Sequence, residues 1–146
     1  MQNVNILLVE DNEGDILLTT EALEEIKVAN NLTVARTGEA AIDLLNEQAA
    51  GQNKQKPLPD LILLDVNLPR INGHEVLKYI KEHEDLKHIP VIMLTTSSSI
   101  DDISKSYRKH VNCYIVKPVE SEEFLKAVIQ IENFWFNIVK LPSKTD

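Results

Sequence analysis

Short apolar runs alternate along the chain with longer segments in which apolar residues recur every three or four positions. Runs of this length, bounded by turn residues, are typical of strands buried on both faces of a parallel sheet. The sequence therefore predicts five strands, at Val4–Val9, Leu32–Ala35, Leu61–Leu64, Val91–Leu94 and Tyr114–Val116. The Leu32–Ala35 run is the least apolar, so we expect it at an edge of the sheet.

Helical periodicity fills the intervals between these strands, and each helix is expected to turn one apolar stripe towards the sheet. The residues expected to face inward are, helix by helix, Leu18, Ala22, Ile26 and Ala29; Ala40, Ala41, Leu44 and Leu45; Val76, Leu77 and Ile80; Ile100, Ile103 and Tyr107; Phe124, Leu125, Val128 and Ile129. Ser98 or Ser99 can cap the fourth of these helices. Strands that alternate with helices through short links predict an α/β fold, a parallel sheet with helices on both faces.

Polar residues stand at the carboxyl ends of four of the five strands. Glu10 and Asp11 follow the first strand and Asp65 ends the third. Thr95 follows the fourth strand and Lys117 follows the fifth. Because parallel strands end at the same edge of a sheet, we expect these groups to converge on one pocket, where open α/β sheets bind their ligands.

The chemistry of this set points to a phosphoryl group beside a metal ion. Three crowded carboxylates repel one another unless a cation neutralises them, and oxygen-only ligands suit a hard ion such as Mg²⁺. Lys117 adds a fixed positive charge and Thr95 a hydroxyl donor, which are groups that a phosphoryl group needs around its oxygens. The nucleophile left over is Asp65, since carboxylates can form aspartyl-phosphate intermediates.

The segments that carry these groups resemble the receiver domains of two-component response regulators, the CheY-like family. Their order and spacing match the family from Val4 to about Val128, and the matching stretches are Ile6–Asn12, Asp60–Gly73, Ile89–Thr96 and Tyr114–Pro118. The resemblance implies a flavodoxin-like, doubly wound sheet of strand order 2-1-3-4-5. It also implies one receiver domain over residues 1–132.

Carried over by position, the resemblance implies a role for each polar residue at the strand ends. Asp65 would be the phospho-acceptor, and the ligands of Mg²⁺ would be Glu10, Asp11, Asp65 and the main-chain carbonyl of Asn67. Thr95 and Lys117 would contact the phosphoryl oxygens, and Tyr114 would change rotamer on activation. The Lys117–Pro118 bond is expected to be cis. The chain would catalyse only its own Mg²⁺-dependent phosphoryl transfer and autodephosphorylation, so it would not be an enzyme in the usual sense.

Shorter motifs near the C-terminus resemble the small stand-alone regulators that pair with bacterial phytochrome histidine kinases. These motifs are Val111–Tyr114, Glu132–Trp135 and Leu141–Pro142. The resemblance implies that a sensor histidine kinase, of the phytochrome type or from another phosphorelay, is the phosphodonor. Too few residues follow the receiver for a helix-turn-helix domain, so we expect the output to be made through protein contacts.

Residues 133–146 are expected to form an aromatic-rich extension of the last helix and a tail, with contiguous Phe134, Trp135 and Phe136. The apolar stripe of the last helix continues into this segment, and further apolar groups lie on its other sides. A helix that is apolar all round needs more cover than one flank of a small domain provides. We therefore expect a homodimer or a partner-binding surface here. The alternative is that the tail folds back over its own domain.

Composition limits the remaining possibilities. The chain is 43% apolar and 26% charged, which is ordinary for a globular protein. No apolar run approaches the roughly 20 residues that span a bilayer, and no secretory signal is recognisable. The single cysteine, Cys113, excludes an internal disulfide and fits a reducing cytoplasm. A net charge of −8 argues against binding to nucleic acid, which normally requires a basic face.

Two alternatives use the same residues differently. A phosphatase resembling the haloacid-dehalogenase group would also have a nucleophilic aspartate at a strand end. Such an enzyme needs a second aspartate two residues later as general acid, where this chain has Asn67, which cannot act as an acid. A receiver-like scaffold that is never phosphorylated is disfavoured because Asp65, Thr95, Lys117 and the acidic pair are all intact.

Overall fold

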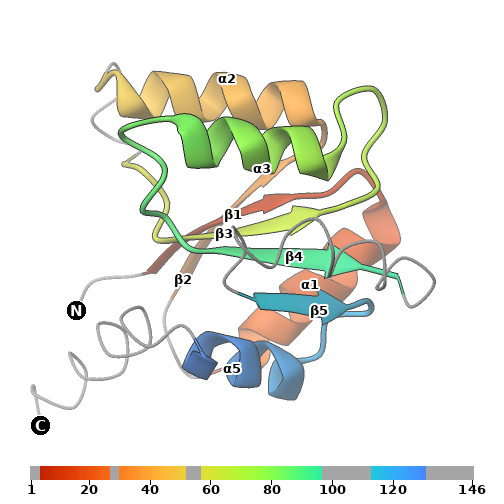
Figure 1. Ribbon diagram of the computed structural model, residues 1–146. Helices are drawn as coiled ribbons and strands as arrows, with labels where there is room; N and C mark the ends of the chain where they lie inside the picture. The colour runs from red at the N-terminus through yellow and green to blue at the C-terminus, as the bar shows by residue number, and fades with distance from the viewer. Residues whose placement is uncertain (1–3, 27–29, 52–56, 97–112, 131–146) are drawn as a thin grey trace, which may run out of the picture.

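A computed structural model describes residues 4–26, 30–51, 57–96 and 113–130, which form a parallel sheet between two layers of helices (Figure 1). The sheet order is β2-β1-β3-β4-β5, and every neighbouring pair is parallel. The predicted fold and strand order are therefore confirmed, and the least apolar strand lies at an edge. The strands are β1 (Val4–Val9), β2 (Asn30–Ala35), β3 (Leu61–Asp65), β4 (Val91–Thr95) and β5 (Cys113–Val116).

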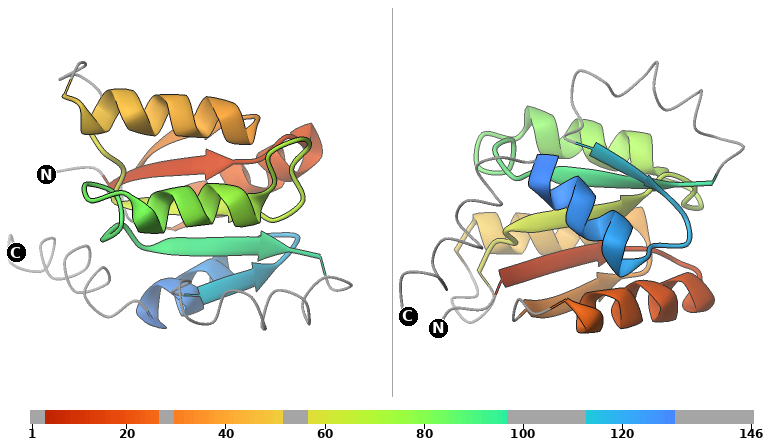
Figure 2. Two further views of the ribbon diagram at one scale, coloured as in Figure 1. Left: turned by 45° about the horizontal axis from the view of Figure 1, so that its top comes forward. Right: turned by 90° about the horizontal axis from the view of Figure 1, so that it is seen from below.

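Four helices are described, and three of them begin at a capping side chain. Helices α2 and α3 cover one face of the sheet, and α1 and α5 cover the other (Figures 1 and 2). The side chains of Asn12, Thr37 and Asn72 accept hydrogen bonds from main-chain amides in the first turns of α1, α2 and α3. The helices are α1 (Glu13–Glu25), α2 (Gly38–Ala49), α3 (Gly73–Glu82) and α5 (Ser121–Gln130). The helix predicted around Ile100–Tyr107, with its serine caps, lies outside the described residues.

Alternate residues of β1, β3 and β4 serve two separate cores, which explains why these central strands are so apolar. The core beneath α2 and α3 takes Leu7, Val9, Ile62, Leu64, Val91 and Met93 from the strands. The core beneath α1 and α5 takes Ile6, Leu8, Leu61, Leu63, Ile92 and Leu94. Burying each such side chain contributes about 1.5–3 kcal/mol, so both faces of the sheet hold the strands in register.

The helix faces were predicted correctly in α3 and only partly in α1, α2 and α5, where Ala127 is buried and Leu125 only partly so. The buried face of α3 is the predicted one, and in α5 Phe124 is buried as expected. Leu18 and Ala40, however, are exposed. In α1 the buried residues are Ile16, Thr19, Ala22 and Leu23. A polar residue, Thr19, thus occupies the inward position that the apolar periodicity had assigned to Leu18. None of the described helices is both long and apolar enough to cross a membrane.

Candidate functional site

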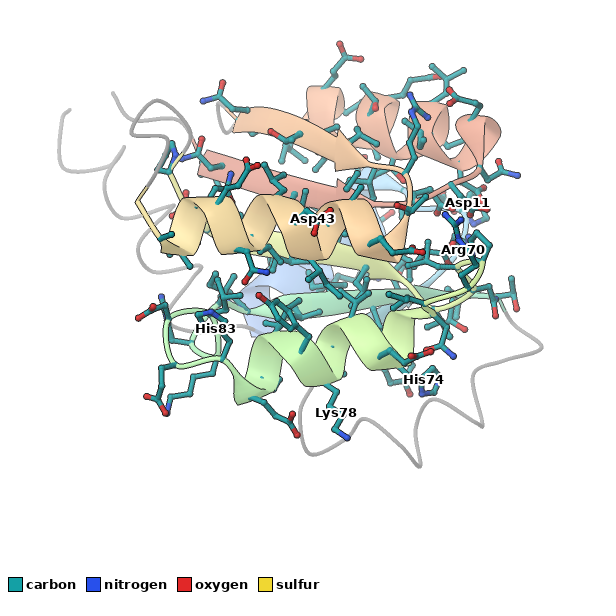
Figure 3. The ribbon with its side chains drawn as sticks, turned by 90° about the horizontal axis from the view of Figure 1, so that it is seen from above. Asp11, Asp43, Arg70, His74, Lys78 and His83 are labelled. Atoms are coloured by element: carbon teal, nitrogen blue, oxygen red, sulfur yellow. The ribbon has the colours of Figure 1, made fainter. Side chains whose placement is uncertain are left out.

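The register of β1 and β3 brings the acidic residues together. Val9 pairs with Leu64, so the residues that follow each of them, Glu10 and Asp65, lie side by side at the carboxyl edge of the sheet. Asp11 is at the same edge, where Figure 3 labels its side chain. The carboxylate oxygens of these three acids lie within 4.8 Å of one another. Glu10 and Asp65 are buried, whereas Asp11 is exposed.

The register of β3, β4 and β5 adds the hydroxyl and the ammonium. Asp65 pairs with Leu94, and the next residue of that strand, Thr95, pairs with Val116. Lys117 follows Val116, and its main-chain amide donates a hydrogen bond of 2.6 Å to the Thr95 carbonyl. The five residues that the sequence predicted for this edge are therefore together in space.

Two main-chain amides hold the buried carboxylates in place. The Asn12 amide donates to Glu10 Oε2 over 3.3 Å, and the Asn67 amide donates to Asp65 Oδ1 over 3.2 Å. Both donors lie in the turns that follow the strands, so each carboxylate is oriented by its own turn. Asn67, whose carbonyl the resemblance named as a metal ligand, is exposed in the turn after β3.

The Glu10 carboxyl binds its proton more tightly than an ordinary glutamic acid does. Burial raises the pKa of Glu10 to about 8, and the hydrogen bond with Asp65 and its negative charge act in the same direction. The Lys117 ammonium and the Asn12 amide oppose this shift without cancelling it. The acids at this edge therefore still repel one another despite the one ammonium beside them. An oxygen-only donor set with an exposed side fits a hard divalent cation that keeps some of its waters.

Lys117 is surrounded by carboxylates. Its side chain is 12% exposed, and Nζ lies 3.2 Å from Glu10 Oε1, 3.2 Å from Asp65 Oδ1 and 3.0 Å from Asp15 Oδ2. Burial alone would lower the pKa of Lys117, but the hydrogen bond to Asp15 and the charges of Asp65 and Glu10 raise it above its ordinary value. The ammonium is therefore permanently charged at the edge where the carboxylates meet.

Sequence reasoning missed Asp15, because it lies in the first turn of α1 and not at a strand end. Its main-chain amide donates a 2.9 Å hydrogen bond to the side chain of Asn12, the N-cap of that helix. A cap residue directly after the first strand, followed three positions later by an acid, was the available signal. It places Asp15 over the same edge of the sheet as Glu10.

Thr95 and Tyr114 occupy neighbouring strands. Thr95 is buried, and its hydroxyl donates a 3.0 Å hydrogen bond to the main-chain carbonyl of Thr96. Tyr114 is 40% exposed. It lies two residues before Val116, the partner of Thr95 in the register, so both point to the same face of the sheet.

The turn after β3 packs tightly against the end of that strand. The Gly73 amide donates a 3.0 Å hydrogen bond to the Val66 carbonyl. A Cβ atom at Gly73 would lie 2.3 Å from the main-chain oxygen of Asp65, so only glycine fits there. Across the edge, the Lys117–Pro118 bond is cis, as the resemblance predicted. Phe134, Trp135 and Phe136 lie outside the described residues, and so does the boundary predicted at residue 133.

Comparison with known proteins identifies the family. Residues 6–129 match the model of the response regulator receiver domain. The chain belongs to this family. Among its relatives, the response regulator Rcp1 of a Synechocystis species is 46% identical over 138 residues, which are 94% of this chain and 92% of Rcp1. The receiver resemblance seen in the sequence is thereby confirmed, and with it a part in two-component signalling.

Three solved structures are also similar to this receiver. The bacteriophytochrome response regulator AtBRR is 44% identical, with a TM-score of 0.81 over 92% of this chain and 96% of AtBRR. The phosphorylated cyanobacterial phytochrome response regulator RcpA is 44% identical, with a TM-score of 0.72 over 92% of this chain and 95% of RcpA. The Mn²⁺-bound form of Rcp1 is 45% identical, with a TM-score of 0.71 over 93% of this chain and 96% of Rcp1.

Proposed function

We propose that this receiver accepts a phosphoryl group on Asp65 from the phosphohistidine of a sensor histidine kinase. An oxygen of the Asp65 carboxylate attacks phosphorus as the bond from phosphorus to the imidazole nitrogen breaks, and the imidazole leaves with a proton. The observation that carries the proposal is the Lys117 ammonium, which lies 3.2 Å from Asp65 Oδ1 beside the other two carboxylates. The phosphorylated form of the relative RcpA supports it.

We propose that Mg²⁺ binds between the carboxylates of Glu10, Asp11 and Asp65 and the main-chain carbonyl of Asn67. When bound, the cation neutralises the acids and the negative charge of the incoming phosphoryl group. The closely grouped acids support a divalent cation, and so does the Mn²⁺-bound form of the relative Rcp1. Mg²⁺ is our choice among such cations because it prefers carboxylate sites that leave it several waters.

The remaining residues act on the phosphoryl group through their donors. Lys117 donates to a phosphoryl oxygen and so stabilises the charge that spreads over these oxygens in the transition state. Thr95 turns its hydroxyl from the Thr96 carbonyl to a second phosphoryl oxygen. Water later hydrolyses the acyl phosphate in the same site, so the receiver limits the lifetime of its own signal and acts on no separate substrate.

We propose that Thr95 and Tyr114 transmit the signal to the surface. When the Thr95 hydroxyl moves to the phosphoryl group, it vacates space that the Tyr114 ring can enter. The partial exposure of Tyr114 supports a ring that still has an inward position to adopt. The two packings exist before phosphorylation and only their populations change. Structures with and without beryllofluoride test this, because unchanged positions of both side chains would remove the mechanism.

We propose a phytochrome-type histidine kinase as the upstream partner and the cytoplasm as the location. The support is the identity of 44% to AtBRR and RcpA, both of which are described as phytochrome response regulators. The partner is tested by mixing phosphorylated phytochrome kinases with the receiver and measuring phosphoryl transfer to Asp65. No transfer from any such kinase, with normal phosphorylation by a small phosphodonor, would assign the receiver to another phosphorelay.

We also propose that the segment with Phe134, Trp135 and Phe136 pairs two copies of the chain or binds a partner. Sedimentation of the full chain, and of a variant truncated after Glu132, with and without beryllofluoride tests the homodimer. We expect the full chain to associate and the truncated chain to be monomeric. A full chain that is monomeric at tens of micromolar in both states would leave only the partner-binding surface.

The acceptor itself is tested with phosphoramidate as phosphodonor in the presence of Mg²⁺. Wild-type protein should gain one alkali-labile phosphoryl group, detected by mass, and a chelator should prevent this. Asp65→Asn should gain none, while the matched variant Asp60→Asn, at an exposed acid just before the same strand, should behave as wild type. Equal labelling of Asp65→Asn would show that the acceptor is another residue.

A further inference from the structure

Asp15 is the contact of Lys117 that the chemistry of the site leaves without a role. Its carboxylate accepts a 3.0 Å hydrogen bond from Lys117 Nζ, which is shorter than the distances from Nζ to Glu10 or Asp65. It is not one of the acids grouped closely enough to share a metal ion, among the residues that the structure describes. Asp15 would therefore still pair with Lys117 when a metal ion binds the other acids.

The geometry indicates that Asp15 holds the Lys117 ammonium in place and does not draw it away from Asp65. The Lys117 ammonium reaches Asp15 at 3.0 Å and Asp65 at 3.2 Å from a single position, so contact with one does not draw it from the other. Asp15 is itself held, because its amide is bound to the Asn12 side chain at the start of a helix. The Asp15 side chain is 28% exposed and that of Lys117 only 12%, so water competes little for the ammonium.

We propose that Asp15 is a positioning residue for phosphoryl transfer, which holds the Lys117 ammonium where the phosphoryl group on Asp65 will need it. Before phosphorylation, an ammonium with three N–H donors faces the carboxyl groups of Glu10, Asp15 and Asp65. When Glu10 and Asp65 bind a cation, the hydrogen bond to Asp15 keeps the long lysine side chain in one rotamer. The other donors are then free to turn to the phosphoryl oxygens. The proposal rests on the proposed role of Lys117.

The test compares phosphorylation rates of Asp65 from phosphoramidate at saturating Mg²⁺, followed by mass. Asp15→Asn, which keeps the shape but loses the charge, should phosphorylate about tenfold more slowly, since misplacing a catalytic group by about an ångström has effects of this size or larger. Its affinity for Mg²⁺, measured by calorimetry, should stay within about twofold. Asp15→Glu should recover part of the rate. An Asp15→Asn protein with a wild-type rate would overturn the proposal.

Glu13→Gln is the matched control, because Glu13 is another acid in the first turn of α1 but pairs with Arg36 away from Lys117. This variant loses the same interaction with the helix dipole and should phosphorylate at the wild-type rate. If it slows as much as Asp15→Asn, the effect belongs to the helix start and the proposal is wrong.

A double-mutant cycle separates this proposal from the proposed function. If Asp15 acts through Lys117, then Asp15→Asn should have no further effect in a Lys117→Met background. A further tenfold loss in that background would show that Asp15 acts by another route. A wild-type rate in Lys117→Met alone would instead refute the proposed role of Lys117. Slow Lys117→Met with normal Asp15→Asn would refute only the role of Asp15.

Discussion

Two partly buried lysines at opposite ends of the sheet have opposite surroundings. Lys117 lies at the carboxyl edge and contacts three carboxylates. Lys81 lies near the end of α3, and its ammonium donates to the main-chain carbonyls of Lys87 at 3.2 Å and Ile89 at 2.9 Å, just before β4 begins. Figure 3 labels Asp11 at one of these ends and His83 at the other.

The difference in partners shifts the pKa values of the two lysines in opposite directions. Burial lowers the pKa of Lys81, whereas the carboxylates around Lys117 outweigh burial and raise its pKa. Carbonyl dipoles satisfy the donors of Lys81, but they do not neutralise its charge. At the other end the carboxylates outnumber the one ammonium, so that end attracts a further cation. A buried lysine therefore indicates a reactive site only when the charges around it are considered.

The largest effect is expected from Gly73, where the carboxyl edge is assembled. Gly73→Ala would place a methyl group 2.3 Å from the Asp65 main-chain oxygen, and that neighbour is backbone and cannot easily move. We expect a loss of about 3 kcal/mol or more in the free energy of unfolding, measured with urea. Gly14→Ala, which meets only the Asn12 side chain at 3.2 Å, is the control and should change stability by less than about 1 kcal/mol. Equal losses of stability in the two variants would mean that the backbone around Asp65 can move to accept the methyl group.

Exchanging the two lysines for methionine should separate their roles. Lys117→Met should slow phosphorylation of Asp65 by phosphoramidate about 100-fold, the effect of removing one donor from an anionic transition state. Lys117→Arg should not restore the rate, because a planar guanidinium fork cannot occupy the position of the compact ammonium between Asp15 and Asp65. Lys81→Met should keep the wild-type rate. A Lys81 variant that slows as much as Lys117→Met would end the contrast between the two ends.

The sequence predicted the structure best in the strands, where burial alone determines the pattern of residues. The central strands β1, β3 and β4 are buried on both faces and have no polar side to hide their pattern, and all five strands were predicted with small errors at their ends. The parallel register then placed Glu10, Asp65, Thr95 and Lys117 together without further information. The chemistry of carboxylate, hydroxyl and ammonium predicted a phosphoryl site with Asp65 as nucleophile, and the family resemblance assigned the finer roles.

Contacts between elements of different kinds were harder to predict. Asp15 reaches the site from a helix, and neither strand ends nor apolar periodicity draws attention to an acid in a first turn. Leu18 was placed inward because the periodicity counts leucines, but the rotation of α1 follows from its cap at Asn12, which turns Asp15 and Ile16 towards the sheet. Lys81 has the sequence pattern of a solvated lysine, and it is partly buried because its ammonium reaches the carbonyls of Lys87 and Ile89.

The proton on Glu10 should make stability depend on pH. The pKa of Glu10 is about 8 in the folded protein and 4.5 in the ordinary case, so between these values the folded state binds a proton that the unfolded state lacks. Stability should therefore fall as pH rises from about 5 to 8, by up to about 1.4 kcal/mol per unit in the absence of metal. Urea unfolding in chelator should show this slope in wild type and a flatter one in Glu10→Gln. Mg²⁺ should stabilise wild type more at pH 8 than at pH 6, because binding the cation requires Glu10 to lose its proton.

The smallest effect is expected at the other end of the sheet. Lys81→Met removes two hydrogen bonds to carbonyls and one buried charge, so we expect a net change of only about 1 kcal/mol in the free energy of unfolding at pH 7. The pKa of Lys81 is lowered, so its ammonium destabilises the fold at neutral pH, and this cost disappears as pH rises towards 10.5. Wild type should therefore gain stability relative to Lys81→Met as pH rises from neutral towards 10.5, measured as the difference between their urea midpoints. Relative to Lys117→Met the wild type should show no such gain, because the raised pKa of Lys117 keeps its stabilising charge throughout this range. A gain of equal size against both variants would mean that the carboxylates do not distinguish the two lysines.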